Sequence, residues 1–137
     1  VEPYLISAAL NMVLAQRLVR RICSKCREPY EPPKNLRKAL ESMGCDFEKL
    51  YRGVGCRKCR NTGFSGRIGV HELLSANDAM RDGIVRGASI SELRRIAVDD
   101  GMAPLHIDGL RKVREAITTV EEVLHIAGDA AIGTEKT

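Results

Sequence analysis

Two short stretches, CSKC at residues 23–26 and CRKC at residues 56–59, are the most informative parts of this 137-residue sequence. Two residues between paired cysteines let both sulfurs of one turn reach the same ion, and two such turns supply the four soft donors of a tetrahedral zinc site. Glycines at 53 and 55 allow the tight backbone of the second turn. We therefore expect one structural Zn²⁺, bound by four residues: Cys23, Cys26, Cys56 and Cys59.

A thiol-redox enzyme is the alternative for a C-x-x-C pair, but a redox site needs one pair and this chain has two. The pairs are 29 residues apart, which is longer than in common zinc ribbons, but the intervening segment has room for a helix that returns the chain. Because all four donors are cysteines, the site should be closed to water and structural rather than hydrolytic. Cys45 is left over, and we expect it to be a small buried hydrophobe rather than a fifth ligand or a sensor.

Cations crowd both cysteine pairs in the sequence. A four-thiolate zinc site carries a formal charge near −2, and nearby cations offset it, so this clustering needs no external partner. The alternative is a free-standing zinc-binding module that contacts nucleic acid through the cations of residues 17–27 and 57–60. The lack of interleaved aromatic residues and a net charge of only +4 count against it, and no nucleic acid is expected. The cations are Arg17, Arg20, Arg21, Lys25, Arg27, Arg52, Arg57, Lys58 and Arg60.

The spacing of apolar residues predicts a mainly α fold with a short β element. The predicted elements are a long buried helix over 5–22, a short amphipathic helix over 34–43, a strand over 67–74, and helices over 78–86, 91–99, 104–114 and 119–127. Ser89 with Glu92 and Thr119 with Glu122 match the capping-box pattern of helix starts. The chain then divides into a long helix (1–22), a zinc-binding subdomain (23–60), a strand with C-terminal helices (61–128) and a frayed tail (129–137).

Several functions are excluded or disfavoured by what the sequence lacks. There is no G-x-x-x-x-G-K-[ST] loop, so this chain alone should not cradle the phosphates of a nucleotide, and we predict no catalytic residues. The apolar stretch over 5–15 is too short and too interrupted to span a bilayer, so no transmembrane segment is expected. With no signal peptide and no initiator methionine, the chain is expected to be an excised fragment.

Three groups of motifs resemble, in order, the C-terminal region of the bacterial type II secretion and type IV pilus assembly ATPases. The first is VEPYLISAAL at 1–10 with AQRLVRRI at 15–22 and the first cysteine pair. The second is GCRKCRNTGFSGRIGVHELL at 55–74. The third comprises MAPL at 102–105, DGLRKV at 108–113 and TTVEEV at 118–123. The resemblance extends over nearly the whole chain, up to Gly128.

This resemblance implies a piece of a homo-hexameric motor in the bacterial cytoplasm, peripheral to the inner membrane, that hydrolyses ATP to drive type II secretion or type IV pilus assembly. The chain would be the C-terminal part of the RecA-like α/β domain, and the Walker motifs would precede it. ATP and Mg²⁺ would therefore be cofactors of the parent protein only, and the fragment alone should be inactive. The implied partners are the inner-membrane platform proteins of the secretion or pilus system.

The resemblance also assigns roles to individual residues. Family members carry a tetracysteine zinc module at the positions of the two cysteine pairs. Arg67 matches an arginine near bound nucleotide, where a guanidinium could contact phosphate or adenine; the alternative is a surface arginine at a strand edge. Ala116 departs from the family pattern, because many relatives have glycine there. We expect that departure to affect only the local turn.

Overall fold

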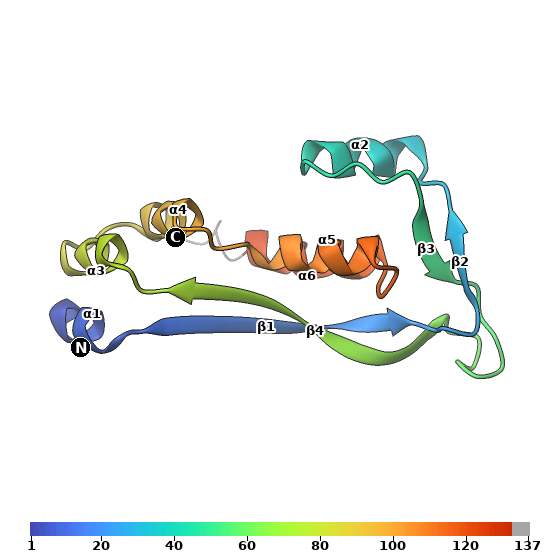
Figure 1. Cartoon of the computed structure of the whole chain (residues 1–137), viewed down its shortest axis with the longest axis horizontal. Helices are drawn as coiled ribbons and strands as arrows, with labels where there is room; N and C mark the ends of the chain where they lie inside the picture. Colours follow the sequence, from blue (N-terminus) through green and yellow to red (C-terminus); the bar gives the residue numbers. More distant parts are fainter. Residues whose placement is uncertain (133–137) are drawn as a thin grey trace. The chain divides into compact units, whose positions relative to one another are not determined.

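The computed structural model describes the backbone of residues 1–132 and the side chains of residues 1–127. Figure 1 shows the elements in chain order. They are α1 (Pro3–Ala9), β1 (Met12–Ile22), β2 (Arg27–Tyr30), α2 (Lys34–Ser42), β3 (Leu50–Gly53), β4 (Phe64–Ser75), α3 (Asp78–Val85), α4 (Ile90–Asp99), α5 (Leu105–Arg114) and α6 (Val120–Ile132). The strands form two two-stranded sheets, β1 with β4 and β2 with β3.

Most of the predicted elements are present. Helices α2, α3, α4, α5 and α6 and strand β4 overlap the ranges expected from the sequence. Both helix starts with a capping-box pattern use the predicted cap, since Ser89 Oγ accepts from the Glu92 N–H at 3.2 Å and Thr119 Oγ1 from the Glu122 N–H at 3.3 Å. Helix α6 continues to Ile132, and residues 133–137 of the predicted tail lie outside the described residues.

The prediction of one long helix over 5–22 is wrong. Helix α1 ends at Ala9, where Leu10 takes an extended conformation, and the rest of the segment is β1, paired with β4. A short apolar run cannot be assigned to helix or strand by periodicity alone, and here hydrogen bonding to a strand more than forty residues away decides the outcome. Strands β2 and β3 were also missed. Pro29 lies in β2, where a two-stranded sheet leaves a strand edge that tolerates a missing N–H.

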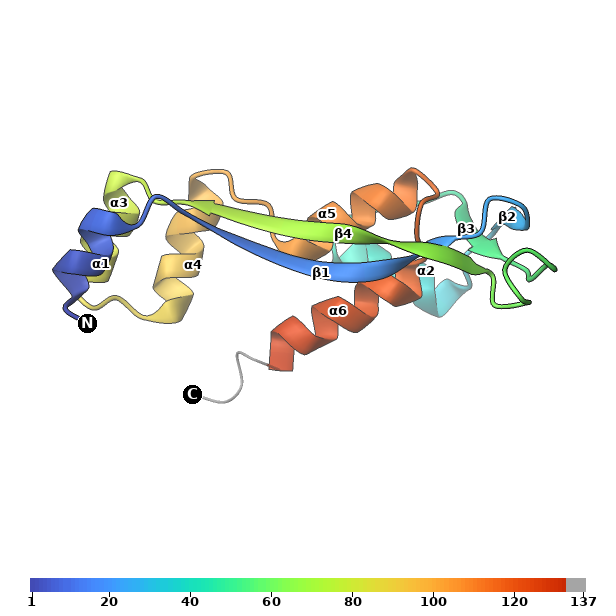
Figure 2. The same ribbon diagram turned by 90° about the horizontal axis from the view of Figure 1, so that it is seen from below.

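The chain forms two compact units. The first comprises Val1–Gln16 and His71–Leu105, and Figure 2 shows its helix α1 beside α3. Ser7 and Arg81 join these helices through reciprocal hydrogen bonds, because the Arg81 guanidinium donates to the Ser7 carbonyl and the Ser7 hydroxyl donates to the Arg81 carbonyl. Buried Met80 and Ala97 contribute to the apolar interior of this unit.

The second unit comprises Arg17–Val70 and the residues from His106 onward. Its aliphatic core brings α2 and β3 together with α5 and α6, as expected for a sequence with only five aromatic residues. Strand β2 pairs antiparallel with β3, and Arg27 lies opposite Gly53 in their register. This small sheet connects the core to the cysteine turns. The buried core residues are Leu40, Phe47, Leu50, Leu110, Val113, Val120 and Val123.

Four helices end in the same backbone motif. Helices α2, α3 and α4 are each followed by a glycine with positive φ, at Gly44, Gly87 and Gly101. Helix α5 ends identically, but the left-handed position is Ala116, with φ of 61°. The Ala116 N–H donates to the Val113 carbonyl and the next N–H to the Lys112 carbonyl, which is the Schellman arrangement. Alanine at 116 is therefore outside the helix, in a conformation that favours glycine.

Candidate metal centre

The four predicted ligand cysteines come together in the second unit. Their sulfur atoms all lie within 4.8 Å of one another. The Cys23–Cys56 and Cys26–Cys59 Sγ–Sγ distances are both 3.8 Å, and the Cys56–Cys59 distance is 3.7 Å. A regular tetrahedron with metal–sulfur bonds of about 2.3 Å has edges of about 3.8 Å, whereas a disulfide would hold two sulfurs about 2.05 Å apart. The spacing therefore fits a tetrathiolate metal site, and no disulfide joins these cysteines.

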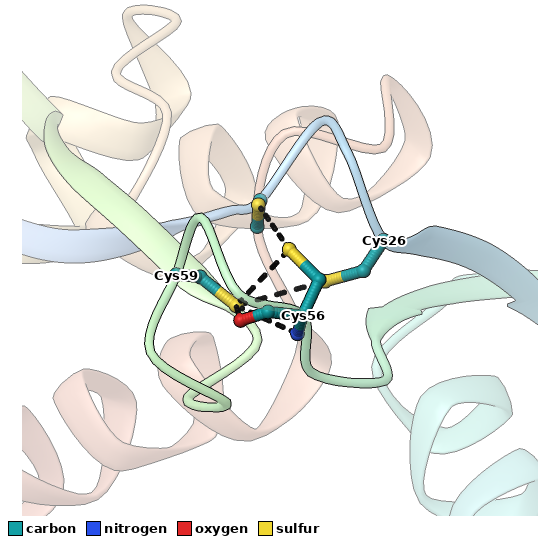
Figure 3. Close-up of side chains that lie close together, drawn as sticks. Cys26, Cys56 and Cys59 are labelled. Atoms are coloured by element: carbon teal, nitrogen blue, oxygen red, sulfur yellow. Dashed lines mark hydrogen bonds between the residues drawn. The ribbon is translucent and has the colours of Figure 1, made fainter.

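The two cysteine turns come from the ends of paired strands. Cys23 follows β1 and Cys26 precedes β2, while Cys56 follows β3 and Cys59 precedes β4. Figure 3 shows the side chain of Cys26, from the first turn, close to those of Cys56 and Cys59 in the second. Within the second turn the Asn61 N–H donates to the Cys56 carbonyl at 2.9 Å. The β2–β3 pairing thus brings together two turns that lie about thirty residues apart in the sequence.

Backbone contacts between the two turns hold them in this position. The Cys23 N–H donates to the Gly63 carbonyl at 2.9 Å, and the Val54 N–H donates to the Cys26 carbonyl at 3.2 Å. Gly53 and Gly63 pass so close to each other that a Cβ built on Gly53 would lie 2.6 Å from the Gly63 Cα. Real Cβ atoms essentially never come that close to a neighbour. Glycine at both positions is therefore a steric requirement of the site.

The electrostatic environment differs between the sulfurs. Burial acts to raise the pKa of Cys59, but N–H groups of Cys56 and Gly63 donate to its sulfur at 3.2 and 3.3 Å, and with the neighbouring thiols they lower that pKa to about 6. Burial, reinforced by the surrounding thiols, raises the pKa of Cys26 to about 12. As pH rises, Cys59 therefore loses its proton before Cys26 does. A cation that binds all four sulfurs must displace the protons that the other thiols still carry.

The site is enclosed. Cys23, Cys26 and Cys59 are buried and Cys56 is half-buried. Four sulfurs that complete a tetrahedron leave no open position for a reacting water, so the arrangement can brace the fold but is not built for hydrolysis. Cys45 lies elsewhere, half-buried against the core of α2, α5 and α6. It therefore packs as a small hydrophobe, as expected, although it is less deeply buried than predicted.

Seven of the nine cations that crowd the cysteines in the sequence fall into two groups, and the other two, Arg17 and Arg21, are exposed on β1. Lys25, Arg57, Lys58 and Arg60 are exposed on the cysteine turns themselves. Others make internal contacts: Arg20 pairs with Glu122, Arg27 donates to the Ala116 carbonyl at 3.2 Å, and Arg52 pairs with Glu28. From the sequence alone these arginines are only charge around the metal. The contacts of Arg20 with α6 and of Arg27 with the end of α5 join residues about 90 to 100 positions apart, so no local pattern predicts them.

Arg67 lies on β4 with an exposed side chain, and its contact with nucleotide stays a prediction.

Among the residues that the structure describes, no helix has the combined length and apolarity that crossing a bilayer requires.

Residues 1–125 match the family model described as "Type II/IV secretion system protein", and the chain belongs to that family. This match confirms the resemblance drawn from the sequence motifs.

The relatives are named as ATPases. The chain is 48% identical over 126 residues to the type IV pilus assembly ATPase PilB of Thermus thermophilus. The matched region covers 90% of this chain and 14% of that protein. It is 42% identical over 130 residues to the type II secretion system ATPase E of Vibrio cholerae, covering 95% of this chain and 26% of that protein. It is also 39% identical over 129 residues to PilB of Myxococcus xanthus, and this match covers 90% of this chain and 22% of that protein. The chain thus spans about a quarter or less of these relatives.

Proposed function

We propose that this chain is the C-terminal segment of a hexameric cytoplasmic ATPase that powers type II secretion or type IV pilus assembly at the inner membrane. One observation carries the proposal: the family match covers residues 1–125, and the similar proteins are named as ATPases of these two systems. The relatives are about four to seven times longer than the matched segment. ATP and Mg²⁺ would therefore bind in the parent protein, and this segment would contribute structure rather than the phosphate-binding loop.

The metal in this proposal is one Zn²⁺ held by Cys23, Cys26, Cys56 and Cys59. The all-cysteine donor set and the edges of 3.7–3.8 Å support zinc, which prefers four soft ligands in a tetrahedron. When bound, the ion supplies cross-linking energy, about 10–16 kcal/mol in small zinc modules, and no chemistry. That energy is comparable with the whole stability of a domain, about 5–15 kcal/mol, so ion loss should unfold the cysteine turns.

An exposed apolar surface in the first unit supports incorporation into a larger RecA-like domain. Isolated soluble domains rarely leave so many large apolar side chains in contact with water along one continuous segment. Strand β1 pairs only with β4 among the described residues, so its other edge is available to a further strand. We propose that preceding parts of the parent chain cover this surface. The exposed residues are Tyr4, Leu5, Ile6, Met12, Val13 and Leu14.

Arg67 is the proposed nucleotide contact of this segment. Its exposed position on β4 leaves the guanidinium accessible to a phosphate or an adenine ring presented by the rest of the parent protein. In the full-length protein, Arg67→Ala should raise the KM for ATP, whereas Arg57→Ala on the cysteine turn should not. An unchanged KM for ATP in the Arg67→Ala variant would show that Arg67 does not contact the nucleotide and is a surface arginine.

The proposal is tested by comparing the full-length protein with the 137-residue chain. We expect the full-length protein to form hexamers in native mass spectrometry and to hydrolyse ATP, and the short chain to do neither. If the full-length protein neither binds nor hydrolyses ATP, the motor assignment is wrong. A strong, salt-dependent gel shift of the short chain with DNA or RNA would instead favour nucleic-acid binding through Lys25, Arg57, Lys58 and Arg60.

A further inference from the structure

A hollow in the second unit lies between the loop that follows α2, which includes Cys45, and one face of α5, and none of the four clustered cysteines lines it. Its volume is about 250 Å³. Phe47 and Leu110 are buried beneath it, and Met43 and Ile107 are half-buried at its sides. Arg111 and Arg114 line it with exposed side chains. The hollow therefore combines an apolar floor with a cationic rim.

The size of the hollow favours a side chain as its occupant. Pockets for small-molecule ligands usually have about 300–1,000 Å³, so this one is slightly too small for a cofactor or a metabolite of ordinary size. One or two apolar side chains of another protein would fill it. Interface anchors are typically single large side chains that enter such preformed pockets.

The hollow is preformed because its loop is fixed by backbone hydrogen bonds. The Gly44 N–H donates to the Glu41 carbonyl and the Cys45 N–H to the Leu40 carbonyl, both at 2.9 Å. These bonds close the end of α2 and fix the backbone around Met43, while Phe47 is held by burial in the core. A partner would therefore bind without the entropic penalty of ordering this loop.

The rim carries two arginines that form no ion pair within the described part of the chain. Arg111 and Arg114 are three residues apart on one face of α5, and neither pairs with a carboxylate in the described residues. Lys112, between them, is already paired with Asp108 at 2.9 Å. The Arg114 guanidinium lies over the Phe47 ring, 5.5 Å from its centre, and so is positioned beside the floor. Two exposed carboxylates lie nearby in the sequence, since Asp46 precedes Phe47 and Glu115 follows Arg114. Neither forms an ion pair with these arginines.

We propose that this hollow, formed by Met43, Phe47, Ile107 and Leu110 with Arg111 and Arg114, docks an acidic segment of a partner protein. An aliphatic or aromatic side chain of the segment enters the apolar hollow, and flanking Asp or Glu carboxylates pair with the two guanidinium groups. Paired hydrogen bonds from arginine to a carboxylate supply orientation, and the buried anchor supplies most of the affinity. This inference does not depend on the ATPase assignment, so either can fail alone.

The test titrates the zinc-loaded 137-residue chain with two blocked hexapeptides and follows methyl and amide NMR shifts. Both peptides have a leucine–phenylalanine centre; one is flanked by two glutamates on each side and the other by two lysines. We expect the glutamate peptide to shift signals of Met43, Ile107 and Leu110, with a dissociation constant that increases at higher salt. The lysine peptide should cause no such shifts. No response to the glutamate peptide at millimolar concentration, or an equal response to both peptides, would overturn the proposal.

Two kinds of variant separate the rim from the floor. Arg111→Glu with Arg114→Glu should weaken binding of the glutamate peptide at least about tenfold, whereas Arg94→Glu with Arg95→Glu, at exposed positions of α4, should leave it unchanged. Ile107→Trp should block the hollow while keeping both arginines, and should also abolish binding. Circular dichroism checks that each variant is folded. If the peptide-free chain dimerises in sedimentation and the rim variant becomes monomeric, the occupant is a second copy and the partner assignment is wrong.

Discussion

The Glu122 carboxylate in the first turn of α6 accepts three hydrogen bonds from Arg20 of β1, a residue 102 positions earlier in the chain. Its Oε2 accepts from the Arg20 backbone N–H at 2.9 Å, and its Oε1 accepts from Nε and Nη2 at 3.0 and 2.7 Å. The same guanidinium lies 4.0 Å from the centre of the Phe64 ring. Thr118 Oγ1 adds a 2.8 Å bond to the Arg20 carbonyl. These contacts fix the start of α6 to the part of β1 that leads into Cys23.

Glu122→Gln should lower the free energy of unfolding by about 1–2 kcal/mol at pH 7, because it removes the charge from a carboxylate that is only 17% exposed and makes three bonds. The matched control is Glu28→Gln. Glu28 is 46% exposed and pairs with Arg52 at 3.4 Å, so its loss should cost less than about 0.5 kcal/mol. Urea unfolding of the zinc-loaded chain measures both. Equal effects of the two substitutions would show that the Arg20–Glu122 contact contributes no more than a surface pair.

The same carboxylate predicts a pH dependence. Burial would raise the pKa of Glu122, but the hydrogen bonds and charge of Arg20 outweigh burial and hold that pKa below its usual range. A carboxyl group with a lowered folded-state pKa stabilises the fold above its unfolded-state pKa, about 4.3, and the stabilisation is lost as pH falls through the folded-state value. We therefore expect the stability difference between the native chain and Glu122→Gln to shrink below about pH 4.3. A difference that stays constant down to pH 3 would contradict this.

Thiol accessibility should distinguish Cys45 from the other four cysteines. In the zinc-loaded chain a thiol reagent should modify Cys45 alone, and all five cysteines should react after chelation under denaturing conditions. Cys56→Ser should abolish stoichiometric zinc binding, measured by elemental analysis, and should loosen the cysteine turns. Cys45→Ser should retain one zinc per chain. Four or five reactive thiols in the native, metal-loaded chain would argue against a tetrathiolate centre.

The close approach of Gly53 and Gly63 predicts a steric effect on the metal site. Gly63→Ala should weaken zinc binding at least about tenfold, because the new Cβ would press against the Gly53 backbone and displace the carbonyl that accepts from the Cys23 N–H. Gly66→Ala is the matched control. Gly66 has nearly the same φ, 78° against 79°, but its Cβ would meet only a side-chain atom of Arg21 at 3.9 Å. Competition with a chromophoric chelator measures both affinities, and equal losses would assign the effect to backbone strain alone.

Ala116→Gly should stabilise the chain by about 0.5–1 kcal/mol. The left-handed conformation disfavours alanine by about 1–2 kcal/mol, and part of this gain is offset by the greater freedom of glycine in the unfolded chain. Gly87→Ala is the reverse control, because Gly87 has φ of 72° with no atom within 4 Å of an added Cβ. That substitution should destabilise by a similar amount. A destabilised Ala116→Gly variant in thermal unfolding would show that the alanine methyl packs usefully at its buried position.

Much of the candidate site could be predicted from sequence because its information is local. The short spacing of a C-x-x-C turn brings its two sulfurs close together without any help from the rest of the fold. The four candidate ligands could therefore be predicted by assuming that the two turns meet. Helices α2 to α6 were also predictable, since the capping residues and the glycines that follow α2, α3 and α4 act within a few residues of the helix ends.

The segment 5–22 shows where that reasoning stops. Its apolar spacing fits a helix, yet residues 12–22 are a strand, because pairing with β4 supplies hydrogen bonds that no local pattern reveals. Arg20 likewise belongs to a cluster of cations in the sequence, and only the fold makes it the partner of Glu122.

The sequence by itself determined which four cysteines form the candidate site, most of the helices and the family of this chain, since each depends on residues close together or on motifs in a fixed order. Tertiary structure decided that β1 is a strand, that Arg20 holds α6, that Gly53 must face Gly63, and that a cationic apolar hollow forms beside α5. These features depend on contacts between residues ten to a hundred positions apart. Only the folded chain brings such residues within reach of each other.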